Sequence, residues 1–304
     1  MTGARVNTSG RFERLRRACR TIRKRAGVSW YQLRRNRLTM VGLAIVMLLA
    51  LVAVFAPFIA PYPGDEEGTS LGNRLKPPSR EHLFGTDDLG RDVFSRVVLG
   101  ARISLRVGVI AIGATMAIGI PIGAMAGFFG GWVDEAMMRL TDICLAFPHL
   151  MLALAISAAL GSGLRSAMLA ISLTWWPWYA RLVRGQALQL RNQPFVYAAR
   201  SMGATDADII LRHILPNCIG PVIVNASLDM GYIILATASL GFIGVGAQAP
   251  TPEWGLMVST GRKFFLTSPW MALFPGLAIF VAVLGFNLLG DGLRDVFDPR
   301  SRPR

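Results

Sequence analysis

Long apolar runs separated by blocks of charge constrain the fold of this chain more than any other feature. The first run, 38–60, is long enough to cross the roughly 30 Å hydrocarbon core of a bilayer as a helix. Only 16% of the residues are charged, against about 25% in soluble domains. Further apolar runs occupy 103–129, 143–160, 167–182, 219–243 and 271–289. The pattern predicts an all-α polytopic membrane protein with six transmembrane helices.

The basic residues gather before the first apolar run and set the predicted topology. Residues 1–37 hold twelve Arg or Lys and the single acid Glu13. Such an excess marks the cytoplasmic side and is attracted to anionic membrane lipid. Six spans then place both termini in the cytoplasm. The net charge of +14 would also suit a nucleic acid partner, but zinc-finger spacing and interleaved basic and aromatic residues are absent, so no nucleic acid partner is predicted.

The charge blocks divide the chain into five predicted segments. Three cysteines lie far apart without metal-ligand spacing and are expected to be free thiols. The first apolar run is interpreted as an uncleaved signal anchor. The segments are a basic cytoplasmic stretch at 1–37, a first transmembrane helix at 38–60, an extracytoplasmic loop at 61–102, a five-helix core at 103–290 that includes a cytoplasmic loop at 183–217, and a cytoplasmic tail at 291–304.

The polar loop at 192–217 carries strong local structure signals. Pro194 suits the first turn of a helix, and Gly203 suits the end of that helix because glycine adopts positive φ at low cost. Thr205, followed three residues later by an acid, predicts the start of a second helix. Pro216 is expected to end it. The loop is therefore predicted to form helix, glycine turn and helix.

The second predicted helix, 206–215, carries an apolar stripe of Ile209, Ile210 and Ile214. Such a helix can lie in a groove on a partner protein. It can equally pack beneath its own helical bundle. Spacing alone leaves both interpretations open.

The same loop resembles a family signature. Ala198-Ala199, then Gly203-Ala204, then His-Ile-Leu-Pro-Asn at 213–217 resemble the EAA loop of ATP-binding cassette importer permeases. Tyr197 stands where that pattern usually has an acid. In the family this loop is the coupling helix, which sits in a cleft of the ATPase subunit. The resemblance implies a coupling role for Tyr197, Ala198, Ala199, Arg200, Gly203, Ala204, Asp206, His213 and Pro216.

Three further stretches, 84–105, 250–255 and 274–300, resemble the second (C-type) permease subunit of dipeptide and oligopeptide importers. With the first span, the resemblance covers about residues 30–300. It implies a type I importer permease fold in the bacterial inner membrane. The implied partners are a second homologous permease, two cytoplasmic ATP-binding subunits and an extracytoplasmic substrate-binding protein, and the implied cargo is a di- or oligopeptide.

The chain lacks the sequence motifs of an enzyme. It has no G-x-x-x-x-G-K-[ST] phosphate loop, no G-x-S-x-G elbow and no H-E-x-x-H pair. We therefore expect a non-catalytic subunit with no cofactor or metal of its own, and ATP and Mg bound by the partner ATPases. Two alternatives remain: a secondary transporter driven by an ion gradient, or an importer of the same family that carries a nickel complex, glutathione or an oligosaccharide.

Polar groups inside apolar runs are costly and mark candidate pathway residues. Asp229 lies near the middle of the fifth run, one helical turn after Asn225, and could attract the amino terminus of a peptide. The alternative is an interhelical hydrogen bond or a contact with the partner permease. Trp175 and Trp178 lie inside the fourth run, where they either line a cavity or pack as bulky core residues.

Two smaller patterns bear on helix packing and helix ends. Small residues recur at Gly119, Gly123 and Gly127, a spacing that lets helices approach closely either within the chain or between subunits. Before the second run, Asp87 and Asp92 are interpreted as capping acids at a helix N-terminus.

Overall fold

The structure is a computed structural model and describes residues 36–63 and 70–297. Most of the predicted basic stretch, and residues 298–304 of the predicted tail, lie outside the described residues. Within those residues every named element is a helix, which confirms the all-α prediction. The α-helices are α2 (Arg37–Ile59), α3 (Val93–Phe129), α4 (Gly131–Leu145), α5 (His149–Leu160), α6 (Leu164–Leu190), α7 (Pro194–Ser201), α8 (Asp206–Ile209), α9 (Leu215–Ile243), α10 (Trp254–Gly261) and α11 (Trp270–Phe297).

Four helical stretches in the described part of the chain are long and apolar enough to cross a membrane. They are α2, α3, the continuous stretch from α8 through α9, and α11. The helices α4 and α5 are apolar enough together and meet at an angle of 85°. They make a fifth span if the pair is counted as one broken span. A continuous helix over 143–160 is therefore wrong, because Pro148 interrupts it. The predicted short loop before this run is helical as α4. The count of six spans is not confirmed.

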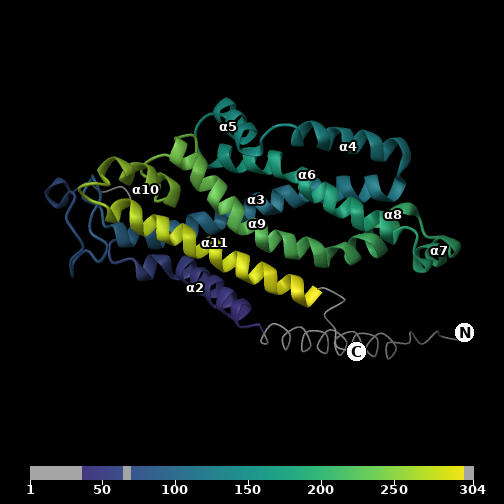
Figure 1. Cartoon of the computed structure of the whole chain (residues 1–304), viewed down its shortest axis with the longest axis horizontal. Helices are drawn as coiled ribbons and strands as arrows, with labels where there is room; N and C mark the ends of the chain where they lie inside the picture. Colours follow the sequence, from purple (N-terminus) through teal and green to yellow (C-terminus); the bar gives the residue numbers. More distant parts are fainter. Residues whose placement is uncertain (1–35, 64–69, 298–304) are drawn as a thin grey trace, which may run out of the picture.

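Helix α6 explains part of this difference. It is 27 residues long, yet it is not among the helices that are apolar enough by composition. Figure 1 shows α6 among α3, α5 and α9, each of which it contacts. Its Ser172 Oγ donates a hydrogen bond of 3.2 Å to the Ala111 carbonyl of α3. A helix covered by other helices does not need an apolar surface all round.

The small-residue row of α3 lies in close contact with α6. A Cβ at Gly119 would lie 2.6 Å from the Trp176 carbonyl oxygen, and a Cβ at Gly127 would lie 2.6 Å from the Arg184 carbonyl oxygen. Gly123 faces the backbone of Ala180 in the same way. The row therefore packs α3 against α6 within the chain, which decides between the two interpretations of this pattern.

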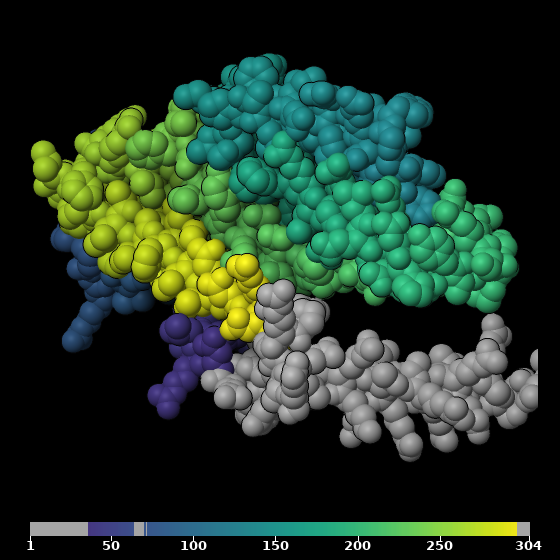
Figure 2. Space-filling model, turned by 45° about the vertical axis from the view of Figure 1, so that its right-hand side comes forward, coloured from purple at the N-terminus to yellow at the C-terminus, as the bar shows by residue number. Residues whose placement is uncertain are grey.

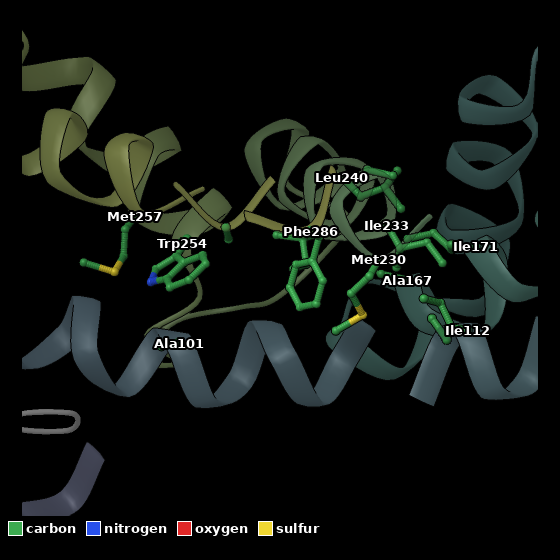
Figure 3. Packing of buried hydrophobic residues seen from close by; sticks show 14 of the residues in the cluster. Ala101, Ile112, Ala167, Ile171, Met230, Ile233, Leu240, Trp254, Met257 and Phe286 are labelled. Carbon is green, nitrogen blue, oxygen red and sulfur yellow. The ribbon is translucent and has the colours of Figure 1, made fainter. Parts of the chain in front are cut away.

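The largest buried cluster joins α3, α6, α9, α10 and α11 (Figure 3). Trp254 of α10 is 1% exposed, and its indole N–H donates to the Val97 carbonyl of α3 at 2.9 Å. Glu253 caps α10 by accepting hydrogen bonds from the N–H groups of Gly255 and Leu256. Burial raises the pKa of the Glu253 carboxyl, and those two N–H groups oppose the shift. The stretch at 250–255 thus fixes α10 against the start of α3.

The capping role expected of the acids before α3 is confirmed for Asp92. One of its carboxylate oxygens accepts from the Ser95 N–H at 2.7 Å, and the other lies 3.0 Å from His82 Nδ1. Nearby, Asp87 pairs with Arg91 at 2.7 Å. All of these side chains are buried or nearly so, and they hold the loop before α3 onto the helix.

Loss of the Asp92 side chain is expected to destabilise this end of the bundle. The Asp92→Ala variant removes an N-cap and leaves the buried His82 ring nitrogen without its partner, at a combined cost of about 2 kcal/mol or more. We expect the midpoint of thermal unfolding in detergent to fall by about 4 °C or more. Glu81→Gln, which changes an exposed carboxylate of the same loop, should leave it unchanged. Equal midpoints for the two variants would contradict the assigned role.

Candidate functional site

The loop at 192–217 has the predicted helix–turn–helix form. Pro194 is the first residue of α7, and Gly203 follows the helix with φ +84°. The Thr205 hydroxyl accepts a hydrogen bond from the Asp208 N–H at 3.2 Å and so caps α8. The local signals for the two helix starts and for the turn are confirmed.

Pro216 does not end the second helix, so that prediction is wrong. Residues 210–214 form a π-helical turn, in which the Leu215 N–H bonds to the Ile210 carbonyl. The wider turn accommodates the proline, which has no N–H to donate to the carbonyl four residues earlier. Helix α8 therefore continues through this turn into α9, and 206–243 form one uninterrupted stretch.

The apolar stripe of the second helix faces the chain's own bundle. Ile209 and Ile214 are fully buried, and they pack in a cluster with Phe128 of α3, Val183 of α6 and Val196 of α7. The interpretation that this stripe lies on a partner is therefore wrong, and packing within the chain is correct. We call this group, to which Tyr179 of α6 also belongs, the anchoring cluster.

The surface that the loop leaves exposed consists of different residues. Met202 is 83% exposed, Leu211 64% and Tyr197 56%. In Figure 1, α7 and α8 lie at the opposite end of the molecule from α10, and this end is visible in green at the right of Figure 2. Met202 and Leu211 are not among the residues predicted from the sequence. For Leu211 the available signal was its position off the Ile209–Ile214 stripe.

The residues implied by the EAA-like pattern divide between surface and core. Ala199 is buried, and Ala204 and His213 are half-buried. The His213 ring lies 6.3 Å from the Phe195 ring between centroids. The remaining implied residues are exposed: Tyr197, Ala198, Arg200, Gly203, Asp206 and Pro216.

Ionic and cation–π contacts reinforce the attachment of the loop. Arg200 forms an ion pair with Asp206 at 3.1 Å, and its guanidinium carbon lies 5.8 Å from the centroid of the Phe128 ring. Arg191 donates to the Gly127 carbonyl at 3.2 Å. Both arginines thus connect the loop region to the end of α3.

A second candidate site is an open cavity of about 540 Å³ between α6 and α9. It brings together all four residues proposed for a pathway, namely Trp175, Trp178, Asn225 and Asp229. Side chains three or four positions apart share one face of a helix, which places each set on the face that borders the cavity. The lining also includes Tyr179, Arg181 and Leu182, which the sequence analysis did not assign to a pathway.

Asp229 shares the lining of this cavity with Trp175 and Tyr179. The indole N–H of Trp175 and the hydroxyl of Tyr179 are buried, and neither has a hydrogen-bond partner among the described residues. Asn225 Nδ2 donates within its own helix to the Pro221 carbonyl at 3.3 Å. Asp229 therefore lies on the cavity wall, and the interhelical hydrogen bond considered for it stays a prediction.

Neighbouring rings hold the Trp175 indole. It stacks on Tyr232 with centroids 4.3 Å apart and planes 16° apart. The His149 ring meets it edge-on at 5.1 Å, and His149 Nε2 contacts the Tyr232 hydroxyl. Among the described residues, no group of three or more His, Cys, Asp or Glu side chains is arranged to hold a metal ion.

Comparison with known proteins identifies the family. Residues 119–303 match the model of the binding-protein-dependent transport system inner membrane component, and residues 26–78 match the N-terminal TM domain of oligopeptide transport permease C. The chain is 48% identical over 271 residues to the dipeptide transport system permease protein DppC of Alkalihalophilus pseudofirmus, covering 89% of this chain and 88% of that protein. It is 47% identical over 273 residues to the glutathione transport system permease protein GsiD of Escherichia coli, covering 90% of each.

A solved structure supports the fold. The chain matches a chain of the MetNI methionine ABC transporter, determined in inward-facing conformations, with a TM-score of 0.52 at 20% identity. The match covers 67% of this chain and 97% of that chain. It supports the type I importer permease fold. The chain belongs to the family of inner membrane components of binding-protein-dependent transport systems, as a C-type permease subunit of an ATP-binding cassette importer.

Proposed function

We propose that this chain and a second homologous permease together form the translocation pathway for di- or oligopeptides delivered by an extracytoplasmic binding protein. The observation that carries the proposal is a physical connection between two sites. Tyr179 belongs to the anchoring cluster beneath the loop and also lines the cavity. Movement of the loop therefore acts directly on the cavity wall.

The mechanism follows from this connection. Two cytoplasmic ATPase subunits bind ATP and Mg and close, and the exposed surface of the loop moves with them. The anchoring cluster, closely packed around Phe128 and Ile214, transmits the movement to α3, α6 and α9, because packed interiors transmit displacement rather than absorb it. The cavity reorients and releases its cargo. No bond of the cargo is broken, so this chain needs no catalytic residue.

The cargo class is proposed from the printed names of two relatives. One carries dipeptides and the other glutathione, which is itself a short peptide. A di- or oligopeptide is therefore the first proposal and glutathione the second. Nickel complexes and oligosaccharides remain alternatives, but no feature of the described cavity supports either of them.

The topology proposed with this function places α7, α8 and both termini in the cytoplasm. In a variant whose native cysteines are replaced by serine, Met202→Cys should form a cross-link to an ATPase subunit of the assembled complex. The matched control is Leu83→Cys, 55% exposed in the loop before α3, which should form none. Cross-linking of the ATPase to position 83 instead of position 202 would overturn both the docking surface and the orientation.

A further inference from the structure

We infer that the cavity between α6 and α9 contains a site for a positively charged ammonium group, with the Asp229 carboxylate as counter-charge and the Trp175 and Trp178 rings as walls. The inference rests on the proposed function, because it names the chemical class of cargo that the same cavity accepts. The inference predicts that a neutral molecule of the same shape binds poorly in this cavity.

The cavity wall carries two charged side chains, Arg181 and Asp229. Arg181 is already paired with Asp142 at 2.7 Å. Asp229 instead shares the lining with the neutral side chains of Trp175 and Tyr179. Neutral neighbours do not cancel the charge of a carboxylate. In a cavity bounded by protein and lipid, an uncancelled negative charge attracts a cation strongly.

Two indole rings line the cavity beside the Asp229 carboxylate. Trp178 is 50% exposed, and its ring centroid lies 6.3 Å from that of Trp175, with the planes tilted by 43°. The stack on Tyr232 fixes the Trp175 ring. Indole faces attract ammonium groups because the ring quadrupole is negative above the plane. Two indoles beside a carboxylate form the type of surface that recognises ammonium ions.

The size of the cavity fits a molecule larger than the ammonium group. Ligand pockets typically span about 300–1,000 Å³, and this cavity has about 540 Å³. The ammonium group would occupy the end at Asp229 and Trp175. The remaining volume, toward Arg181 and Leu182, would accept the rest of the cargo.

The test compares a cation with its neutral isostere. The assembled complex, without its binding protein, is placed in nanodiscs made from lipids that lack choline headgroups. Equilibrium binding of radiolabelled choline is measured, with unlabelled choline and 3,3-dimethylbutan-1-ol as competitors. We expect choline to compete at least about tenfold better than the neutral alcohol, as charge and cation–π attraction together require.

Two variants and their controls assign the site. Asp229→Asn should abolish the preference for choline over the neutral alcohol. Trp178→Leu should weaken choline binding severalfold without strengthening the binding of the alcohol. Glu135→Gln and Trp132→Leu, which change an exposed carboxylate and an exposed indole on α4, should bind as the wild type does. Equal binding of the two probes, no binding of either, or a preference that survives Asp229→Asn would overturn the inference.

Transport by the same preparation separates this inference from the proposed function. ATP-driven uptake of a dipeptide, measured with the binding protein restored, tests the function alone. Uptake by the wild type together with no charge preference in the cavity overturns the ammonium site and leaves the function standing. A charge preference without ATP-driven uptake supports the site and overturns the proposed function.

Discussion

Replacing Gly203 with valine is expected to uncouple ATP hydrolysis from uptake. Gly203 adopts φ +84°, and a Cβ there would meet no atom within 4 Å. The cost is therefore one of backbone conformation, about 1–3 kcal/mol for a β-branched residue in this region. The turn relieves the strain by changing its direction, which redirects α7 relative to α8. Uptake by the reconstituted complex should fall at least about tenfold, since small misplacements are costly in rate, while the ATPases continue to hydrolyse ATP.

Asparagine at the same position is the matched control. It tolerates positive φ better than other non-glycine residues, so Gly203→Asn should retain coupled uptake. The two variants differ little in volume and strongly in backbone preference. Normal coupled uptake by Gly203→Val would show that the turn does not aim the docking surface.

Valine at Gly123 is expected to have the largest effect on assembly. The Cβ would collide with the backbone of Ala180 on α6, and backbone atoms of a packed helix cannot move aside as a side chain can. Overpacking costs about 1–3 kcal/mol and at times more. Because α6 also carries the cavity wall, we expect low yield of the assembled complex and a large fall in its melting temperature.

Gly113→Val provides the comparison on the same helix. Gly113 is exposed, and a Cβ there would have no neighbour within 4 Å. The substitution makes the same change in helix propensity without a collision. Yield and melting temperature should stay near those of the wild type, and equal losses in both variants would mean that α3 and α6 do not depend on this contact.

Local signals predicted the parts of the fold that local physics decides. Pro194, Gly203 and Thr205 each act within one helical turn, so their roles were readable from neighbouring residues. Asp92 belongs to the same group. Its partner His82 lies ten residues earlier, and nothing in the spacing of the two indicated that they would meet.

The predictions that failed have two causes. The direction of the Ile209 and Ile214 stripe depends on the ends of α3 and α6, which lie far away in the sequence. The other two failures concern how the backbone adapts near a proline. A π turn before Pro216 lets the helix continue into α9, whereas Pro148 separates α4 from α5 inside an apolar run that reads as one span.

The candidate cavity was partly predictable. Asp229 and Asn225 stood out because polar groups in apolar runs need a reason. Tyr179 did not, since a tyrosine in a run of aromatic residues has no distinctive spacing. Its importance comes from its position between the anchoring cluster and the cavity, which only the packing of helices reveals.

The most direct test of the central account is cargo uptake in vesicles reconstituted with and without the ATPase subunits. The vesicles contain both permeases, the binding protein outside, and an imposed proton or sodium gradient. If this chain is part of an ATP-driven importer, uptake requires the ATPases and ATP, and the imposed gradient does not change the uptake rate. Uptake that persists without any ATPase and follows the gradient would contradict it.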